Sequence, residues 1–465
     1  MKEIDVKVEA LKNGLIRDTQ ELLKIRSLED NAKPGMPFGE EVNKALEKAL
    51  EIAANLGFKT VNLDGYLGYA EYGEGEDYIA VLGHLDVVPE GDGWKYSPYG
   101  GEIHDGRIYG RGAMDNKGPI LSALYGLKAV VDAGLTLSRK VRIIFGTNEE
   151  SGSGEMFYYN EREKEPYAGF TPDAEFPIIY AEKGYIVFDM VKPIKTNSKR
   201  SIKIESIIGG NRPNMVPDYC EAKIITDDPA NVISYLSEFK YENKYDIQYE
   251  RYSEGILLKS YGVSAHGSTP ELGKNAIMQL LAFLGTLPLK DTDVGDFLSF
   301  VNEHIGLETE GESLGINLED TVSGKLSFNV GIINYNEERI ALTINVRYPV
   351  TFNLEDILTR IERKILNNDI ELKNLAHDKP LYFSKEHILI KTLQKVYKEN
   401  TGFEPELLAI GGGTYAKSIS NIVAFGPMFP GSPDLAHQAN EYIEIENLIK
   451  CAKIYGEAIY ELSNS

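Results

Sequence analysis

A histidine and an aspartate stand two residues apart in the stretch GHLDVVPEGDGW, where His84 and Asp86 follow the strand-forming run YIAVL. In extended backbone, side chains at positions i and i+2 point to the same side of the chain. The two polar side chains can therefore face one common object. An isolated H-x-D pair is more often part of a surface turn, in which the histidine meets water and the aspartate caps the backbone. Further ligand-type residues at strand ends or in glycine-rich turns are needed to separate these interpretations.

Further motifs carry such residues in order along the chain. Each has an ordinary explanation, such as a helix cap for the first or a solvated acidic turn for the second. Adjacent carboxylates, however, repel each other unless a cation lies between them. Taken together with the first pair, the motifs favour a metal site built from residues far apart in the sequence. They are Asp115 in GRIYGRGAMDNKGP before an expected helix, Glu149 and Glu150 after the strand KVRIIFG, Asp173 in the proline-flanked loop TPDAEFP, and His437 in GSPDLAHQANEYI.

The cysteine content limits which ligands are available. Only Cys220 and Cys451 are present, far apart and outside any C-x-x-C motif. Neither a disulfide framework nor a thiolate metal site is indicated. Any metal must therefore be held by histidine and carboxylate side chains.

Composition restricts the class of protein and its partners. The chain has 465 residues, of which 42% are hydrophobic and 26% charged, which fits a globular protein with more than one core. Its 49 Lys and Arg against 71 Asp and Glu give a net charge of -22, which would repel a nucleic-acid backbone. The charged amino terminus has no apolar signal-type region, and no stretch is apolar over the length of a bilayer. We expect a cytoplasmic protein with no nucleic-acid or membrane partner.

The elements that must position these residues follow from hydrophobic periodicity. Apolar residues at helical spacing predict helices over about residues 6–25, 42–57 and 119–135, and near the carboxyl terminus over 387–402 and 445–462. Strand-type runs at 67–72, 78–82 and 140–146 alternate with these helices. Such alternation predicts an α/β domain with a mostly parallel central sheet covered by helices.

The middle of the chain has a different pattern of predicted helices and strands. From about Tyr185 it is rich in strand-type pieces, with helical stretches near 276–287 and 354–365. We expect a catalytic domain formed by residues 1–184 and 379–465, interrupted by a large α+β domain over 185–378. Within this insert, the stretch from Ser206 can be laid beside the stretch from Ser327, because both run from a glycine through a polar turn into a strand. This similarity suggests two related subdomains, although any two β-hairpins resemble each other.

The motifs, in their order and spacing, resemble the di-zinc metallopeptidase family that includes aminoacylases, glutamate carboxypeptidases and bacterial dipeptidases of the PepV type. GHLDVVPEGDGW, GRIYGRGAMDNKG, TNEESGSGE, TPDAEFP and the last histidine carry the resemblance, which covers nearly the whole chain. It implies a zinc-exopeptidase-like catalytic domain interrupted by a lid domain. It also implies two Zn²⁺ per chain, for which Mn²⁺ or Co²⁺ could substitute.

The resemblance also assigns roles to the motif residues. His84 is expected to bind one metal, with Glu150 and His437 or Asp173 completing the two ligand shells and Asp115 bridging both ions. Asp86 is expected to orient His84 through the second ring nitrogen. Glu149 is expected to act as general base and to pass a proton to the leaving amine. These assignments use every motif residue found above.

In the insert, the resemblance points to residues that would contact substrate. SYGVSAHGSTPELGKNA resembles the family's lid motif, in which His266 would donate a hydrogen bond to the oxyanion. Asn214 in NMVPD and Arg347 in TINVRYP look like the residues that bind the substrate's carboxylate. In GGGTYAK, the glycines, with Gly412 and Gly413 as candidates, would let backbone N–H groups approach substrate closely.

The length of the insert bears on which amide is cut. It is longer than the lid of dimeric relatives, and it resembles the extended lid of PepV-type dipeptidases, which replaces the second subunit. We therefore expect a monomeric dipeptidase acting on small peptides. The alternative enzyme is an N-acyl amino acid deacylase, such as a desuccinylase or deacetylase, which shares the metal motifs. A non-catalytic metal- or peptide-binding relative is a weaker alternative, because Glu149 and all ligand-type residues are present.

Overall fold

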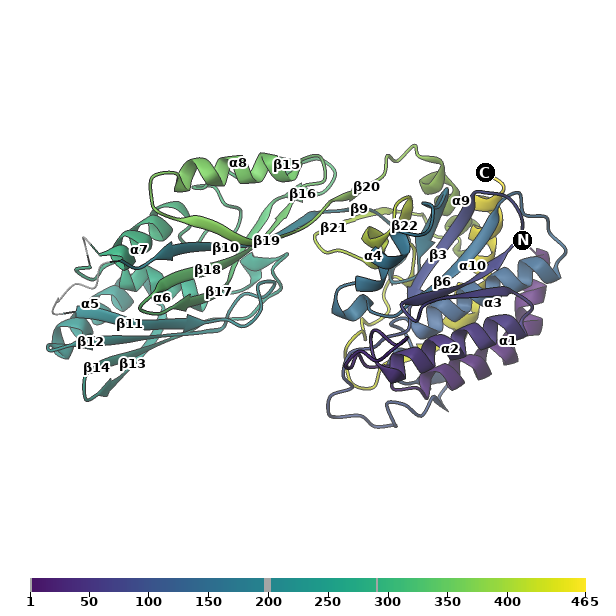
Figure 1. Ribbon diagram of the computed structural model, residues 1–465, viewed down its shortest axis with the longest axis horizontal. Helices are drawn as coiled ribbons and strands as arrows, with labels where there is room; N and C mark the ends of the chain where they lie inside the picture. The colour runs from purple at the N-terminus through teal and green to yellow at the C-terminus, as the bar shows by residue number, and fades with distance from the viewer. Residues whose placement is uncertain (1, 196–201, 290–291) are drawn as a thin grey trace. The chain divides into compact units, whose positions relative to one another are not determined.

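The computed structural model describes residues 2–195, 202–289 and 292–465, and the chain folds into two compact units (Figure 1). Unit 1 comprises Met1–Tyr180, Tyr382–Leu408 and Gly413–Ser465, and unit 2 comprises Ala181–Leu381 and Ala409–Gly412. The functional division expected above, with a lid over 185–378, remains a prediction.

Unit 1 is built around a nine-stranded sheet in the order β1-β2-β6-β3-β7-β22-β9-β20, with β21 paired to β9. Its strands are β1 (Lys59–Leu63), β2 (Leu67–Tyr72), β3 (Tyr78–His84), β6 (Lys140–Gly146), β7 (Ala168–Thr171), β9 (Ile178–Glu182), β20 (Leu381–Tyr382), β21 (Leu407–Ile410) and β22 (Ile422–Ala424).

The centre of this sheet is parallel, and its flanks are antiparallel. β3 runs parallel to both β6 and β7, and β22 runs parallel to β7. β2 pairs with β1 on one side and with β6 on the other, and both pairings are antiparallel. Every residue of β3 is buried, as a continuous apolar run requires when both faces of a strand are covered. The α/β class and the central parallel sheet predicted from the sequence are confirmed.

Helices cover the central strands of unit 1 in Figure 1. They are α1 (Lys2–Leu23), α2 (Glu40–Asn55), α3 (Lys117–Asp132), α4 (Gly154–Asn160), α9 (Ile388–Thr401) and α10 (Ile445–Ser463). α3 and α10 both pack on β3, and they approach each other closely at Gly126 and Gly456. A Cβ at position 126 would lie 2.6 Å from the carbonyl oxygen of Ala452, so glycine is required where the two helices meet.

Unit 2 is an α+β unit with one eight-stranded sheet in the order β13-β14-β12-β11-β17-β18-β10-β19, whose described pairings are all antiparallel. Its strands are β10 (Gly184–Pro193), β11 (Ile202–Gly209), β12 (Tyr219–Thr226), β13 (Asp246–Tyr252), β14 (Gly255–Tyr261), β17 (Ser327–Tyr335), β18 (Arg339–Tyr348) and β19 (Glu371–Asp378).

Alternating burial along these strands places one face of the sheet in a hydrophobic core. The core includes Ile186, Phe188 and Met190 from β10, at positions i, i+2 and i+4. The helices against the sheet are α5 (Pro229–Asn243), α6 (Ala276–Leu284), α7 (Asp293–His304) and α8 (Leu354–Ile365). The α+β fold class expected for the insert is thereby confirmed.

The two similar stretches of the insert both form β-hairpins. β11 pairs with β12, β17 pairs with β18, and β11 and β17 are neighbours in the sheet. Each hairpin has a register irregularity in its first strand, between Ile204 and Ser206 and between Val330 and Ile332. A duplication of the subdomain stays a prediction.

Short elements complete the described chain. They are β4 (Glu102–His104), β5 (Arg107–Tyr109), β8 (Ala174–Glu175), β15 (Glu319–Asp320), β16 (Gly324–Lys325), β23 (Pro427–Met428), β24 (Tyr442–Glu444) and the 3-10 turns Glu149–Ser151, Pro270–Leu272 and Tyr415–Ser418. No described helix has both the length and the apolar character needed to cross a membrane.

Candidate active site

The end of β3 and the start of α3 meet because position 83 is a glycine. A Cβ there would lie 2.9 Å from the Cβ of Ile120 on α3, closer than real side chains approach. With glycine, the turn before α3 can approach the last residue of β3. This close approach brings Asp115 to His84, residues that are separated by 31 positions in the sequence.

The amide of Asn116 connects three segments of the site. Its Oδ1 accepts a hydrogen bond from the backbone N–H of His84 at 3.3 Å, and its Nδ2 donates to the carbonyl of Pro172 at 2.5 Å. The peptide bond between Asp115 and Asn116 is cis. Asn116 therefore holds the strand end, the turn with Asp115 and the loop with Asp173 together, a role that the sequence analysis did not assign.

His84 is fully buried, and its two ring nitrogens face different groups. Nε2 lies 2.9 Å from Oδ1 of Asp115 and 3.5 Å from Oδ1 of Asp173. Nδ1 lies 3.0 Å from the backbone carbonyl oxygen of Asp86. An imidazole that donates its Nδ1 proton to a carbonyl keeps Nε2 as the nitrogen that can bind a cation.

Asp115 presents its two carboxylate oxygens to two different imidazoles. Oδ1 faces Nε2 of His84, and Oδ2 lies 3.2 Å from Nε2 of His437. The same nitrogen of His437 lies 3.0 Å from Oε2 of Glu150. Asp115 thus has one histidine on each side of its carboxylate, and its expected bridging role stays a prediction.

His437 differs from the other members of the site in its exposure. Its side chain is 55% exposed, while that of His84 is fully buried, and its backbone φ of 61° lies in the left-handed region. It belongs to the irregular segment between β23 and β24. The site is therefore closed on one side by the sheet and bordered on the other by a surface loop.

Asp86 contacts the site in a way that differs from the expectation. Its carboxylate Oδ1 lies 3.5 Å from Nδ1 of His84, farther than the backbone carbonyl of the same residue. The two carboxylate oxygens accept the backbone N–H groups of Glu149 and Glu150, at 3.2 and 3.1 Å. The side chain of Asp86 thus fixes the turn with the two glutamates, and its backbone orients His84.

Two groups of side chains could each hold a metal ion. Within each group the ligand atoms lie within 4.8 Å of one another, and the groups are His84 with Glu149 and Asp173, and His84 with Asp115 and Glu150. Distances among ligand atoms alone do not separate the roles of Glu149 and Glu150. Glu150 also lies 3.0 Å from Nε2 of His437, and the expected roles of the two glutamates stay predictions.

The electrostatics of the cluster favour added positive charge. Burial raises the pKa of Asp173 to about 6, against the effect of His84, and burial also raises the pKa of Glu149 well above its usual range. Hydrogen bonds to Asp115 and Glu150 raise the pKa of His437 to about 10. For the two carboxylates, burial is the main cause and the neighbouring carboxylates add to it, while the carboxylates beside His437 favour its protonated form.

The donor set fits zinc. Imidazole nitrogen and carboxylate oxygen are ligands that zinc accepts, whereas oxygen-only sites favour harder ions. The Nε2 atoms of His84 and His437 both face Asp115, and Asp173 and Glu150 each lie beside one of them. Asp115 thus lies between the two imidazoles, each of which has a second carboxylate beside it.

Glu441 supports the turn that carries Asp115, and the sequence analysis missed it. Its buried carboxylate accepts the backbone N–H groups of Gly112, Met114 and Asp115 at 2.9 to 3.1 Å and pairs with Arg111 at 2.7 Å. Burial raises the pKa of Glu441 to about 7. The only sequence signal is an acidic residue four positions after His437, which a surface strand would also show.

A buried pair behind His84 was also missed. The Tyr415 hydroxyl donates to the carboxylate of Glu155, and the ring of Tyr415 lies edge-on to His84 with centroids 6.1 Å apart. Burial raises the pKa of Glu155 to about 7. Nothing in the local sequence separates these residues from ordinary core positions.

In unit 2, Ser268 contacts the Nδ1 atom of His266, which defines the tautomer of the ring. Its Nδ1 lies 2.6 Å from the hydroxyl of Ser268 and accepts the Ser268 backbone N–H at 3.4 Å. Because Nδ1 accepts, the neutral ring carries its proton on Nε2. Burial and the charge of Arg347 lower the pKa of His266, which keeps the ring neutral.

Arg347 is a buried cation, 5% exposed, on β18. Its Nη1 donates to the carbonyl of Gly411 at 2.6 Å, Nε donates to Oδ1 of Asn345 at 3.4 Å, and the guanidinium lies 5.2 Å from the ring centroid of Tyr185. Burial lowers the pKa of Arg347. Within the described chain, no carboxylate forms an ion pair with it.

Of the remaining substrate-binding candidates, Asn214 and Gly412 lie near these two residues within unit 2. The carbonyl of Asn214 accepts the Gly267 N–H at 2.7 Å, next to His266. A Cβ on Gly412 would lie 3.9 Å from Nη1 of Arg347. Gly413 is assigned to unit 1.

The other four histidines lie outside these clusters. His104 stacks on Tyr96 with centroids 3.8 Å apart, and His304 packs on Phe300. His377 bonds to a tyrosine hydroxyl at 2.8 Å, and His387 caps α9.

Comparison with known proteins is consistent with this geometry. Residues 80–461 match the family Peptidase family M20/M25/M40. The chain is 45% identical over 468 residues to "Putative dipeptidase YtjP" of Bacillus subtilis (strain 168), with 99% of each chain covered. Two solved structures share the fold, each with a TM-score of 0.58: human carnosine dipeptidase 1, at 16% identity, and Dug1p, a di-peptidase from Saccharomyces cerevisiae, at 15%. Each structural alignment covers all of this chain, together with 99% of human carnosine dipeptidase 1 and 98% of Dug1p.

The family match spans most of the chain and includes every motif that carries the site, from His84 to His437. The chain therefore belongs to peptidase family M20/M25/M40 and is a peptidase.

Proposed function

We propose that this peptidase hydrolyses dipeptides, using two divalent metal ions and Glu149 as the general base. The observation that carries the proposal is the position of Asp115, whose two oxygens face the imidazoles of His84 and His437. A carboxylate in this position can serve two ions at once. The name of the Bacillus subtilis relative supports the choice of dipeptides.

His84 and Asp173 would hold one ion, His437 and Glu150 the other, and Asp115 both. Zinc is the first choice, and Mn²⁺ or Co²⁺ would also suit such carboxylate-rich shells. When bound, two such ions lower the pKa of a water molecule and polarise the scissile carbonyl.

Among the acidic residues of this cluster, Glu149 is the one to which we assign no metal ion, and it would carry out the proton transfer. Glu150 contacts His437, while Asp86 holds both glutamates through their backbone N–H groups. A carboxylate of Glu149 would take a proton from the attacking water on one oxygen and deliver it to the nitrogen of the leaving amine. Asp86 would keep that carboxylate in place without contacting substrate.

In unit 2, three side chains would act on substrate. His266 has Nε2–H available to donate to the oxyanion, because its Nδ1 accepts from Ser268. Arg347 would pair with the carboxylate of the substrate, aided by Asn214. Its burial without a carboxylate partner in the described chain supports this role, since an unpaired buried cation is costly. Backbone N–H groups at Gly412 and Gly413 would approach the substrate.

The alternative within the family is an N-acyl amino acid deacylase, which would use the same metal site and the same carboxylate contact. A free α-amino group on the substrate distinguishes the two. We favour the dipeptidase because of the relative's name and the long insert. We further propose that the chain acts as a monomer, with His266 serving the metal site of its own chain.

The first prediction concerns metal content. Purified protein should bind two divalent ions per chain by elemental analysis and lose activity on dialysis against a chelator. His437→Ala should retain about one ion, because it removes a ligand of one shell only. His104→Ala, a histidine outside the cluster, should retain both. Full activity with a single ion would contradict a shared two-ion site.

The second prediction concerns the base. Glu149→Gln should lower kcat by about 10² to 10⁴, the usual cost of losing a general acid or base, with metal content near normal. Glu161→Gln, on an exposed side chain, should change neither. If metal content fell with activity, the roles of Glu149 and Glu150 would have to be exchanged.

The third prediction concerns the substrate carboxylate. On a panel of free dipeptides, N-acetylated dipeptides and tripeptides, only free dipeptides should be good substrates, and good turnover of N-acyl amino acids would favour the deacylase. Amidation of the dipeptide's carboxyl terminus should cost about 1.5 to 3 kcal/mol in kcat/KM, the range for a charge-assisted hydrogen bond.

Arg347→Ala should lower kcat/KM for the free dipeptide by a similar amount and should lower kcat/KM for the amidated dipeptide little further. Arg339→Ala, at an exposed position of the same strand, is the control. Additive losses would show that Arg347 does not bind this carboxylate.

The fourth prediction concerns the number of chains per site. Chains carrying Glu149→Ala and chains carrying His266→Ala should each be inactive, and their mixture should remain so when each site uses its own histidine. Activity measured after mixing and re-equilibration tests this. Recovery of turnover would show a site shared between two chains, and the monomer proposal would be withdrawn.

A further inference from the structure

The loop that carries His437 is attached to a distant segment by one amide side chain. Nδ2 of Asn440 donates to the carbonyl of Gly93 at 3.1 Å, and its Oδ1 accepts the backbone N–H of Lys95 at 2.5 Å. Apart from the ring of His437, no other side chain of residues 430–440 hydrogen-bonds to a distant segment within the described chain. Asn440 therefore joins this loop to a segment 345 positions earlier in the sequence.

The backbone of the loop depends on such an attachment. His437 and Asn440 both lie in the left-handed region, with φ of 61° and 64°. This region is unfavourable for residues that have a Cβ, although asparagine tolerates it better than most. A histidine keeps such a backbone only where the surrounding contacts hold it there. The hydrogen bonds of Asn440 are contacts of this kind, in the same loop as His437.

A second connection reaches the same distant segment. Arg111, the partner of Glu441, donates from Nη2 to two backbone carbonyls of residues 89–95, at 3.4 and 3.3 Å. Its guanidinium lies 5.4 Å from the ring centroid of Trp94. Residues 89–95 therefore contact both Asn440 and this buried ion pair.

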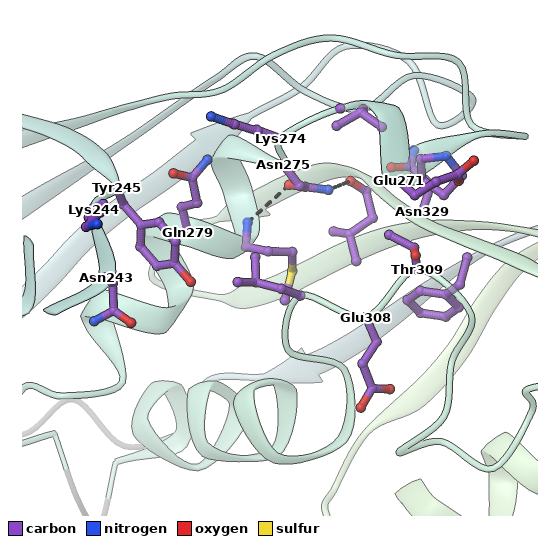
Figure 2. Close-up of a pocket in the computed structure, with 17 residues that line it drawn as sticks. Asn243, Lys244, Tyr245, Glu271, Lys274, Asn275, Gln279, Glu308, Thr309 and Asn329 are labelled. Atoms are coloured by element: carbon purple, nitrogen blue, oxygen red, sulfur yellow. Dashed lines mark hydrogen bonds between the residues drawn. The ribbon is translucent and has the colours of Figure 1, made fainter.

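Unit 2 contains a side-chain connection of the same kind. Asn275 accepts the N–H of Met278 at 3.1 Å and donates from Nδ2 to the carbonyl of Val330 at 2.8 Å, which joins the start of α6 to β17 (Figure 2). Like Asn440, it uses its acceptor and its donor on backbone groups. Because Asn275 belongs to unit 2, and the candidate metal ligands belong to unit 1, it offers a matched comparison.

We propose that Asn440 is a positioning residue for the metal ligand His437, a role that rests on the proposed two-ion site. Through its bonds to Gly93 and Lys95, Asn440 holds the loop so that Nε2 of His437 stays at the carboxylates of the cluster. It would not contact the ions or the substrate.

Only one of the two imidazoles needs this support. His84 is the last residue of β3, a strand whose residues are all buried. The side chain of His437 is 55% exposed and belongs to a surface loop. Groups that orient a metal ligand typically change metal affinity by about 10- to 100-fold when they are removed. Loss of Asn440 should therefore weaken one ion by this factor and leave the other unchanged.

The test is a titration of the metal-free full chain with Zn²⁺ in competition with a chromophoric chelator. Asn440→Gly removes both hydrogen bonds and still permits the left-handed backbone, so it should weaken one of two ions by about 10- to 100-fold. Asn275→Ala removes the corresponding bonds in unit 2 and should bind both ions as the wild type does. Equal affinities for both ions in the wild type and Asn440→Gly would overturn the proposal.

A second pair of variants changes the partner of Asn440. Lys95→Pro removes the backbone N–H that Asn440 accepts, whereas Lys95→Ala retains it. Lys95→Pro should weaken the same ion, and Lys95→Ala should not. Combined with Asn440→Gly, Lys95→Pro should cause little further loss, since both changes break one interaction. Additive losses would overturn the proposal, because they would show that the two residues act independently.

His437→Ala identifies the ion concerned. One ion should remain in this variant, and the addition of Asn440→Gly should leave the affinity for that ion unchanged. A weaker remaining ion would show that Asn440 supports the whole site, which would overturn its assignment to His437. A wild-type chain that binds a single ion would overturn the two-ion site as well. Two ions of unchanged affinity in Asn440→Gly would overturn the present proposal alone.

Trp94 gives a spectroscopic measure of the connection, because it is the only tryptophan of the chain and lies between Gly93 and Lys95. In the metal-free chain, acrylamide should quench its emission more strongly in Asn440→Gly than in the wild type. The reason is that both neighbours of the half-buried indole lose their hydrogen bonds. A weakened ion without increased quenching would show that Asn440 does not act through this segment, and the proposal would be overturned.

Discussion

Repulsion among carboxylates is the constraint on which the site depends. Asp115, Glu149, Glu150 and Asp173 converge on one small region, and such convergence is unfavourable without compensating positive charge. Burial raises the pKa values of Glu149 and Asp173, and the neighbouring carboxylates add to the shift. A scaffold that keeps like charges close is poised to bind cations, because binding then relieves the repulsion.

The framework achieves this through backbone hydrogen bonds from groups outside the ligand set. Asp86 holds the turn with the two glutamates, Glu441 holds the turn with Asp115, and Asn116 links the strand end to both neighbouring loops. Each of these side chains is almost completely buried. Their burial makes their hydrogen bonds strong and leaves them little freedom to move, so the candidate ligand side chains are held in place by the fold itself.

In unit 2, a buried positive charge rather than a group of negative charges lacks a compensating partner within the described chain. Arg347 is buried against carbonyl, amide and aromatic groups, none of which neutralises it. His266 is held neutral with one nitrogen accepting. In each case an incomplete set of interactions indicates the kind of group that would complete it.

The sequence by itself determined the α/β class, most helices and strands within a few residues, and the identity of the ligand-type residues. It could do so because apolar periodicity is local, and because the ligands stand at strand ends and glycine-rich turns that are visible in a few residues. Only the tertiary structure decided which oxygen of Asp115 faces which imidazole, and that the backbone of Asp86 lies nearer to His84 than its carboxylate. The role of Glu441 likewise depends on contacts between segments distant in the chain, which no local sequence pattern shows.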